Sequence, residues 1–78
     1  MTITLDELAE HVRTRKALPA PPERRAIREA AGVTLAQVAV VVGVTRSAVS
    51  FWELGESEPR GENLRRYSDV LRVLREAA

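Results

Sequence analysis

The chain has 78 residues, of which 45% are hydrophobic and 29% are charged, and its formal net charge is +1. This length fits one small domain, and the balance of apolar and charged residues is typical of globular rather than disordered chains. With no cysteine and one histidine, His11, a disulfide framework, a thiolate metal site and a serine-type triad are excluded, and no apolar run approaches the roughly 20 residues of a membrane span.

A first helix is predicted over about residues 5–16. Thr4 opens the S/T-x-x-E pattern of a capping box that ends at Glu7. Apolar residues then recur on one helical face, at Leu5, Leu8, Ala9 and Val12. The prolines at positions 19, 21 and 22 end this helix, because proline lacks an amide hydrogen and restricts the residue before it.

A second helix is predicted to begin at Pro22, because proline is well suited to the first turn of a helix. Ile27, Ala30 and Ala31 give this helix its apolar face. Gly32 is expected to end it in a left-handed conformation, which glycine adopts at low cost.

A third helix is predicted from the capping box of T-x-x-Q form that Thr34 opens to Val42. The stretch 38–42 contains enough β-branched residues for a strand, which is the alternative. The cap before this stretch and Gly43 after it favour a helix, and the sequence offers no partner strand elsewhere.

Two more helices complete the chain. Thr45 caps a fourth helix that runs to about Leu54 and ends at Gly55. After a loop over 56–59, apolar residues recur every three or four positions to about residue 76, at Leu64, Tyr67, Leu71 and Leu74. The sequence thus predicts an all-α fold of five helices.

The charge becomes informative when it is followed along the chain. The ranges 19–52 and 65–78 each carry +2, whereas 53–64 carries −3 and 1–18 is neutral. Eleven of the twelve cationic residues are arginine, which suits bidentate contacts with phosphate or guanine, but a GC-rich genome would produce the same bias. The net charge alone therefore does not identify a nucleic-acid binder.

The third and fourth predicted helices give the most informative pattern, because a turn of three residues, Gly43-Val44-Thr45, joins them. Ala39 is small where the second of these helices crosses close to it. Gly43 permits a positive φ in the sharp turn, and Val44 fills the corner between the helices. Residues facing inward are Val38, Ala39 and Val42 from the first helix, and Val49 and Trp52 from the second. This is the helix-turn-helix pattern, in which the second helix enters the DNA major groove.

The stretch from Gly32 to Pro59 closely resembles the Cro/CI-type (Xre-like) helix-turn-helix family. The matching positions are Arg28, Ala39, Gly43, Val44, Val49, Trp52, Glu53, Gly55 and Pro59. The resemblance extends over roughly 22–74 and implies a five-helix, sequence-specific DNA-binding domain, commonly a phage or bacterial transcriptional repressor. We therefore divide the chain into an N-terminal helix and arm (1–18), a proline-rich linker (19–21) and the helix-turn-helix domain (22–78).

The resemblance implies that the helix from Thr45 to Leu54 reads base edges with Arg46, Ser47, Ser50 and Phe51. Arg46 can donate two hydrogen bonds to guanine, which are worth about 1–3 kcal/mol of discrimination. Phe51 cannot hydrogen-bond but can pack against a thymine methyl, and the alternative is a core aromatic. For both serines, the alternative is an exposed helix face with no part in binding.

Three residues are expected to contact DNA phosphates. Thr34 stands at a helix N-terminus, which is a natural anion site, and Thr45 has the same position on the next helix. Arg60 matches a region that touches the DNA backbone in relatives, with a solvated charge as the alternative. Arg24 and Arg25 are weaker candidates.

Four residues are assigned to structural support. The resemblance implies that Glu53 pairs with Arg28 and holds the recognition helix on the core, so that removing one partner costs about 3–5 kcal/mol. Trp52 is expected in the core with its indole N–H at the edge, and Gly43 in the turn.

The chain departs from the family pattern at three places. Leu35 replaces a glutamine that braces the recognition helix and bonds a phosphate in many relatives. Glu56 and Glu58 make acidic a loop that is usually basic, which weakens non-specific DNA binding. Val40 and Val41 are expected to face solvent, so we expect the N-terminal helix or a partner protein to cover them.

These features favour a double-stranded DNA-binding repressor of the phage Cro or immunity-repressor type, cytoplasmic and not an enzyme, which uses neither a metal nor a cofactor. The alternative is an antitoxin or protein-interaction module of the same fold, which binds a partner protein through residues 1–18 or through Val40 and Val41. A homodimer and a monomer on an asymmetric operator both stay open. The apolar side that would supply the dimer contact carries Val70, Val73 and Leu74.

Overall fold

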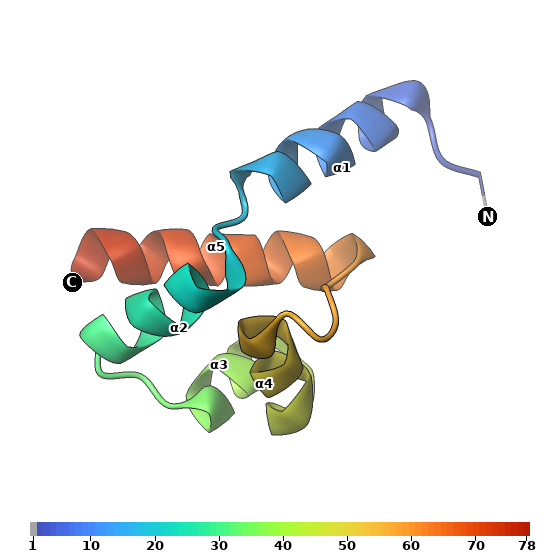
Figure 1. The fold of residues 1–78 in the computed structure, drawn as a ribbon. Helices are drawn as coiled ribbons and strands as arrows, with labels where there is room; N and C mark the ends of the chain where they lie inside the picture. The colour runs from blue at the N-terminus through green and yellow to red at the C-terminus, as the bar shows by residue number, and fades with distance from the viewer. Residues whose placement is uncertain (1) are drawn as a thin grey trace.

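The computed structural model of the protein describes residues 2–78, and for residues 14–17 it describes the backbone alone. This part of the chain folds into five α-helices and contains no strand (Figure 1). The helices are α1 (Leu5–Ala17), α2 (Pro21–Ala30), α3 (Leu35–Val42), α4 (Arg46–Leu54) and α5 (Gly61–Ala77). The predicted all-α fold of five helices is confirmed.

Helix α5 is the longest element, and the other helices are arranged around it. Figure 1 shows α2, α3 and α4 on one side of α5 and α1 on the opposite side. Helix α5 contacts α1, α2 and α3, while α4 contacts α2 and α3. Buried apolar side chains from α3, α4 and α5 fill the core: Val38, Ala39, Val42, Val49, Trp52, Leu64, Tyr67 and Leu71. Within this core, the ring centroids of Trp52 and Tyr67 lie 4.8 Å apart and the ring planes are tilted by 47° relative to each other, an arrangement that aromatic pairs favour.

Side-chain caps and a glycine set the ends of α3 and α4. The Thr34 hydroxyl accepts from the Gln37 amide at 3.1 Å, and the Gln37 side chain accepts from the Thr34 amide at 2.9 Å, which completes the capping box. Gly43 ends α3 with φ +88°, and Thr45 begins α4 with a hydroxyl cap of its own. The stretch 38–42 is therefore helical, and the strand alternative is wrong.

The turn between α3 and α4 favours glycine at position 43 because its φ is positive. The two helices are bent by 109° relative to each other, within the roughly 90–120° range of helix-turn-helix motifs. The Arg66 guanidinium of α5 donates to the Val42 carbonyl at 3.3 Å, and a Cβ on Gly43 would lie 3.4 Å from the same guanidinium.

No single helix within residues 2–78 is long and apolar enough to cross a membrane.

Helix α2 begins one residue earlier than predicted. Pro21, the last residue of the predicted linker, and Pro22 both occupy its first turn, where a missing amide hydrogen breaks no helical bond. Pro21 also lies against the end of α4, because a Cβ on Gly55 would come within 3.3 Å of its ring. The start of the domain and the end of α4 are thus in contact.

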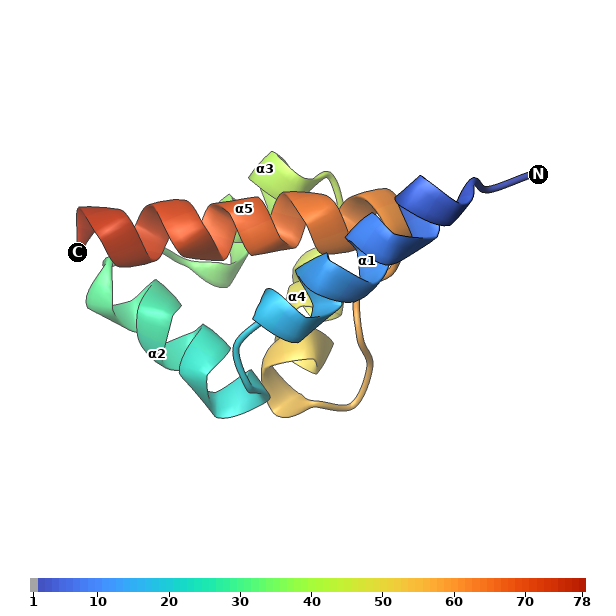
Figure 2. The same ribbon diagram turned by 90° about the horizontal axis from the view of Figure 1, so that it is seen from above.

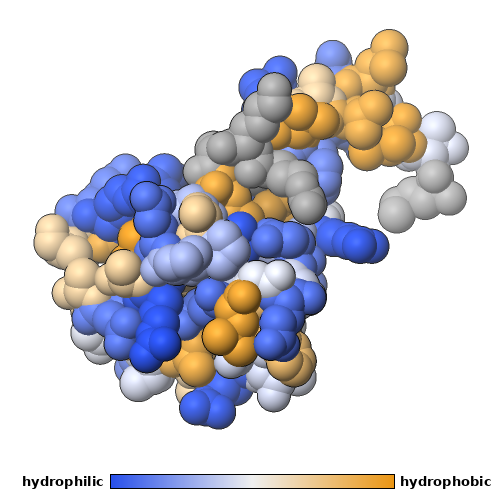
Figure 3. Space-filling view, in the orientation of Figure 1, coloured by the Kyte–Doolittle hydropathy of each residue, from blue (hydrophilic) through white to orange (hydrophobic). Residues whose placement is uncertain are grey.

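Helix α1 turns its polar side toward the rest of the molecule. Of the other helices it contacts α5 alone within the described residues, and Figure 2 shows it lying across the N-terminal end of α5. The α1 residues that line the hollow between the two helices are Glu7, Glu10 and His11. The predicted apolar face stays exposed at Leu5, Leu8 and Val12, and Figure 3 shows this hydrophobic surface over α1 at the upper right.

The expectation that α1 covers the outer valines of α3 is wrong. Val40 and Val41 are 80% and 68% exposed, and α1 makes no contact with α3. The cause is the placement of α1, whose polar residues face α5 across the hollow and which contacts no other helix within the described residues.

Candidate nucleic-acid interface

Helix α4 has two faces of different chemistry. Its inner face buries Val49, Trp52 and Glu53 against the rest of the molecule. Its outer face carries the residues predicted to contact bases: Arg46, Ser47, Ser50 and Phe51. At about 100° per residue in an α-helix, these side chains span an arc of about 140°. The structure therefore brings them together on one outward surface, which we call the α4 arc.

Phe51 contributes an exposed aromatic ring to the α4 arc. Its exposed fraction is 45%, so it is not a core aromatic, and the aromatic positions of the core belong to Trp52 and Tyr67. Arg46 and Ser47 are exposed, and Ser50 is half-buried. The arc thus combines a cation, two hydroxyls and an apolar ring, which are groups that distinguish base pairs in a major groove.

The start of α3 adjoins the start of α4. Thr34, Leu35 and Ala36 line one open hollow together with Arg46. The first amides of a helix have no partner within it, and the capping box uses those of Thr34 and Gln37. The amides of residues 35 and 36 are therefore suited to bind an anion beside Arg46.

Two other residues were predicted to contact phosphate, and both are exposed. The Thr45 side chain accepts a hydrogen bond at the start of α4, and its hydroxyl hydrogen still has the capacity to donate. Arg60 precedes α5 in extended backbone and makes no side-chain capping bond. Neither contacts the core, so each has freedom to reach a ligand.

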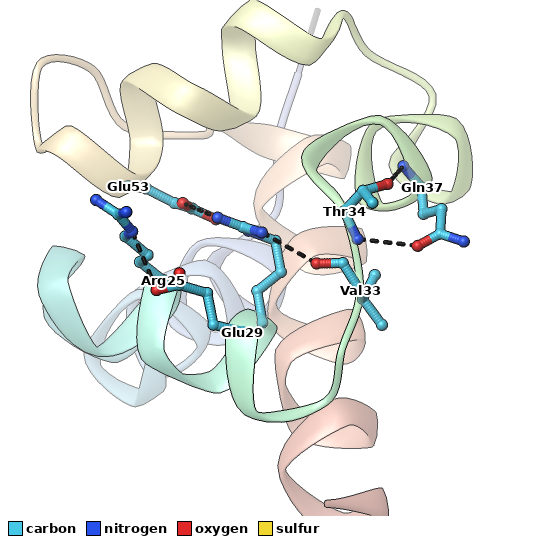
Figure 4. A network of polar contacts seen from close by, with 7 residues as sticks. Arg25, Glu29, Val33, Thr34, Gln37 and Glu53 are labelled. Carbon is cyan, nitrogen blue, oxygen red and sulfur yellow. Dashed lines mark hydrogen bonds and ion pairs between the residues drawn. The ribbon is translucent and has the colours of Figure 1, made fainter.

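A bidentate ion pair fixes α4 from behind. Arg28 of α2 donates to Glu53 through Nε at 2.6 Å and through Nη2 at 3.0 Å, and its Nη1 donates to the Val33 carbonyl at 3.0 Å (Figure 4). Little of either side chain is exposed, and the hydrogen bond to Glu53 raises the pKa of Arg28. The pair therefore joins α2, the α2–α3 turn and α4.

Comparison with known proteins assigns the family. A model of the helix-turn-helix family matches residues 25–76, which is most of the chain and includes α3, the turn and α4. The chain belongs to the Cro/CI-type helix-turn-helix family. Members of this family are DNA-binding regulators, so double-stranded DNA is the ligand class that membership implies. Neither the curated proteins nor the solved structures contain a match to the chain.

A second arginine, Arg24, is buried behind the helix-turn-helix and was not among the residues assigned to structural support. Arg24 was a weak candidate for phosphate contact, but it is 4% exposed, so that prediction is wrong. It donates to the carbonyls of Pro19 at 2.7 Å and Trp52 at 3.0 Å and pairs with Glu58 at 3.0 Å. Arg24 and Arg28 are four residues apart on α2, and this spacing was the available signal that both face α4.

The pair with Glu58 changes the interpretation of the acidic loop before α5. Glu58 is half-buried and its charge is balanced by Arg24, whereas Glu56 remains exposed. The Glu58 carboxylate therefore stabilises the fold, and it repels phosphate less than an exposed carboxylate would. Leu35, another of the three departures from the family pattern, packs partly buried against the core instead of bracing α4 with a polar group.

Leu54 adds an exposed leucine to the α4 arc and was not among the predicted site residues. It is 61% exposed, and its position falls between those of Ser50 and Ser47 around the helix at about 100° per residue. Its spacing of three residues from Phe51 and four from Ser50 would have placed it on this surface.

Tyr67 places a buried hydroxyl behind the helix-turn-helix. Its hydroxyl oxygen has no hydrogen-bond partner among the described residues. Burial raises the pKa of Tyr67, and the charge of Glu53 acts in the same direction. The Tyr67 hydroxyl therefore stays protonated, and the ring serves as a packing group beside Trp52 in the core.

Proposed function

We propose that the protein is a sequence-specific transcriptional repressor that reads an operator in double-stranded DNA with α4. The observation that carries this proposal is the α4 arc, an outward surface of mixed chemistry on a helix held from behind by the Arg28–Glu53 pair. The nine residues of α4 extend over about 13 Å at 1.5 Å per residue. With its side chains an α-helix is about 10–12 Å in diameter, which fits the major groove, about 12 Å wide.

In this proposal each group of the α4 arc has a definite task. Arg46 donates two hydrogen bonds to guanine O6 and N7, while Ser47 and Ser50 bond to neighbouring base edges and Phe51 packs on a methyl group. Because Trp52 and Glu53 are buried, the helix does not need to be ordered when DNA binds. Binding energy is then spent on the contacts rather than on folding.

Phosphate contacts set the register of α4 in the groove. We assign them to Thr34 with the first amides of α3, to Thr45 and to Arg60, because such contacts position a protein on the duplex without carrying sequence information. The weak net charge of +1 predicts low non-specific affinity, so discrimination depends on the base contacts.

Repression follows if the protein occupies an operator that overlaps a promoter, as phage Cro and immunity repressors do. The protein then acts in the cytoplasm, where a bacterial or phage operator is found. A homodimer would place two copies of α4 about 34 Å apart on a two-fold operator. A surface available for that contact is a hollow of about 430 Å³ between α3 and α5, lined by Val41, Val70, Val73 and Leu74 together with the charged Arg66 and Asp69.

Selection of bound sequences from a random pool of duplex DNA tests the proposal. We expect one enriched sequence word that contains a guanine, and a palindrome in the enriched set would indicate a dimer, whereas an asymmetric word would indicate a monomer. A pool that shows no enrichment after repeated rounds would contradict sequence-specific binding.

The second candidate function is an antitoxin or interaction module that binds a partner protein. The exposed valines of α3 and the outward apolar face of α1 favour it, because contiguous exposed apolar surface often marks a protein interface. Substituting Val40 alone by serine separates the two functions, because Val40 is exposed and does not line the hollow that would supply a dimer contact. DNA affinity is unchanged if α4 is the functional surface, and binding to the partner falls if the outer face of α3 is.

A further inference from the structure

The α4 arc contains an apolar end that hydrogen-bonding chemistry does not use. Phe51 and Leu54 are one helical turn apart, and both are exposed, while Arg46 and the serines lie toward the start of the helix. Neither Phe51 nor Leu54 has a donor or an acceptor. In the major groove, the apolar group that base pairs present is the C5 methyl of thymine.

We propose that the operator must present a C5-methylated pyrimidine to Phe51 and Leu54, with thymine or 5-methylcytosine accepted alike. This inference rests on the proposed function, since it concerns the same α4 arc. A methyl group buried against a ring and a leucine loses contact with water, and each buried carbon of this size changes affinity by about fourfold.

The geometry of α4 places this methyl relative to the guanine. Phe51 follows Arg46 by five residues, or about 7.5 Å along the helix axis at 1.5 Å per residue. Base pairs are stacked at about 3.4 Å, so the methyl that Phe51 contacts lies about two base pairs from the guanine of Arg46. Leu54 is one helical turn further on and extends the apolar surface over the next base pair.

The contact recognises the methyl group rather than the base. Thymine offers an O4 acceptor and cytosine an N4 donor, but Phe51 and Leu54 cannot respond to either group. Unmethylated cytosine and uracil therefore lack what this part of the α4 arc binds. As a consequence, cytosine methylation at this position converts a weak site into a strong one.

The test starts from the sequence selected by the full chain and exchanges single thymines for deoxyuridine. We expect affinity to fall about fourfold at one or two adjacent positions, about two base pairs from the guanine, and to stay unchanged elsewhere. Cytosine at the sensitive position should bind as weakly as uracil, and 5-methylcytosine should restore most of the lost affinity.

Variants of the protein show whether Phe51 and Leu54 are responsible. The double variant Phe51→Ala/Leu54→Ala should bind thymine and uracil operators with equal affinity, and it should remain folded because both side chains are exposed. The matched control is Val40→Ala, which removes exposed apolar surface from α3 and should keep the fourfold difference. A selected operator with no uracil-sensitive thymine, or a double variant that still distinguishes the two bases, would overturn this inference. Failure to select any sequence would instead contradict the proposed function.

Discussion

Arg46 and Arg60 are both exposed cations, but they differ in what surrounds them. Arg46 lies in the first turn of α4 beside the other residues of the α4 arc, whereas Arg60 lies in extended backbone before α5. A guanidinium in the groove contributes to specificity, and one at the phosphates contributes to affinity for every sequence. Substitution of each residue therefore has a distinct effect.

Arg46→Ala should relax the preference at one operator position and cost about 1–3 kcal/mol on the selected sequence. Arg60→Ala should weaken binding to selected and scrambled duplexes alike and lower the salt slope by about 1. Fluorescence anisotropy at several salt concentrations measures both effects. If Arg46→Ala lowers the affinity for the selected and the scrambled duplex equally, as Arg60→Ala should, Arg46 does not read a base.

At the level of single residues, the sequence predicted the ion pair that the family pattern specifies and missed the pair that the pattern does not specify. Arg28 and Glu53 were named together because the family pattern pairs those positions. Arg24 was misassigned because its partner Glu58 is far along the chain, and no local rule links two such positions. Leu54 was predictable from helical spacing alone, since it needs no knowledge of the tertiary fold.

Among the helices, α4 depends most on support from outside itself. It has nine residues, and isolated helices shorter than about 12–15 residues are marginal in water. The Arg28–Glu53 pair, the Thr45 cap and the buried Trp52 supply that support. The shape of the α4 arc therefore depends on the ion pair.

Glu53→Gln should lower the free energy of unfolding by about 3 kcal/mol, because it leaves Arg28 buried without an opposite charge. The double variant Arg28→Met/Glu53→Leu should recover much of this loss. Glu62→Gln is the control, since it breaks exposed pairs with Arg65 and Arg66 that are worth at most about 1 kcal/mol. Urea unfolding measures the free energy of unfolding of all three variants. Equal losses of stability for Glu53→Gln and Glu62→Gln would show that the Arg28–Glu53 pair stabilises the fold no more than the exposed pairs do.

The ends of α3 and α4 were the most predictable feature of the fold, because each is set by a local signal. Thr34, Thr45, Gly43 and Gly55 all occupy the cap positions expected of them. The orientation of α1 was not predictable from its pattern. Its apolar face implied burial, but the packing against α5 uses polar residues, and periodicity does not state which neighbour a face meets.

For the whole molecule, the arrangement separates a helix-turn-helix unit from an appended helix. The family match begins at residue 25, and α1 contacts α5 alone within the described residues. Leu18 packs against the core and Pro19 accepts a hydrogen bond from Arg24. The residues that support the helix-turn-helix unit therefore begin at about Leu18. We propose that α1, which precedes them, is dispensable for DNA binding.

Deleting residues 1–17 should lower the melting temperature by no more than about 8 °C, which corresponds to about 1 kcal/mol for a domain of this size. The affinity for the selected operator should change by less than about twofold, because this loss is local and leaves α3 and α4 intact. Thermal unfolding and DNA titration of the shortened chain measure the two quantities separately. Loss of specific binding with an unchanged melting temperature would place α1 in the DNA interface.

The central claim is that the α4 arc is the surface that meets DNA, and amide chemical shifts test it most directly. On addition of the selected duplex to ¹⁵N-labelled protein, we predict the largest changes along Arg46–Leu54 and at residues 34–36, with small changes at Val40 and Val73. Changes confined to α1 and the outer valines of α3, with α4 unaffected, would contradict the account.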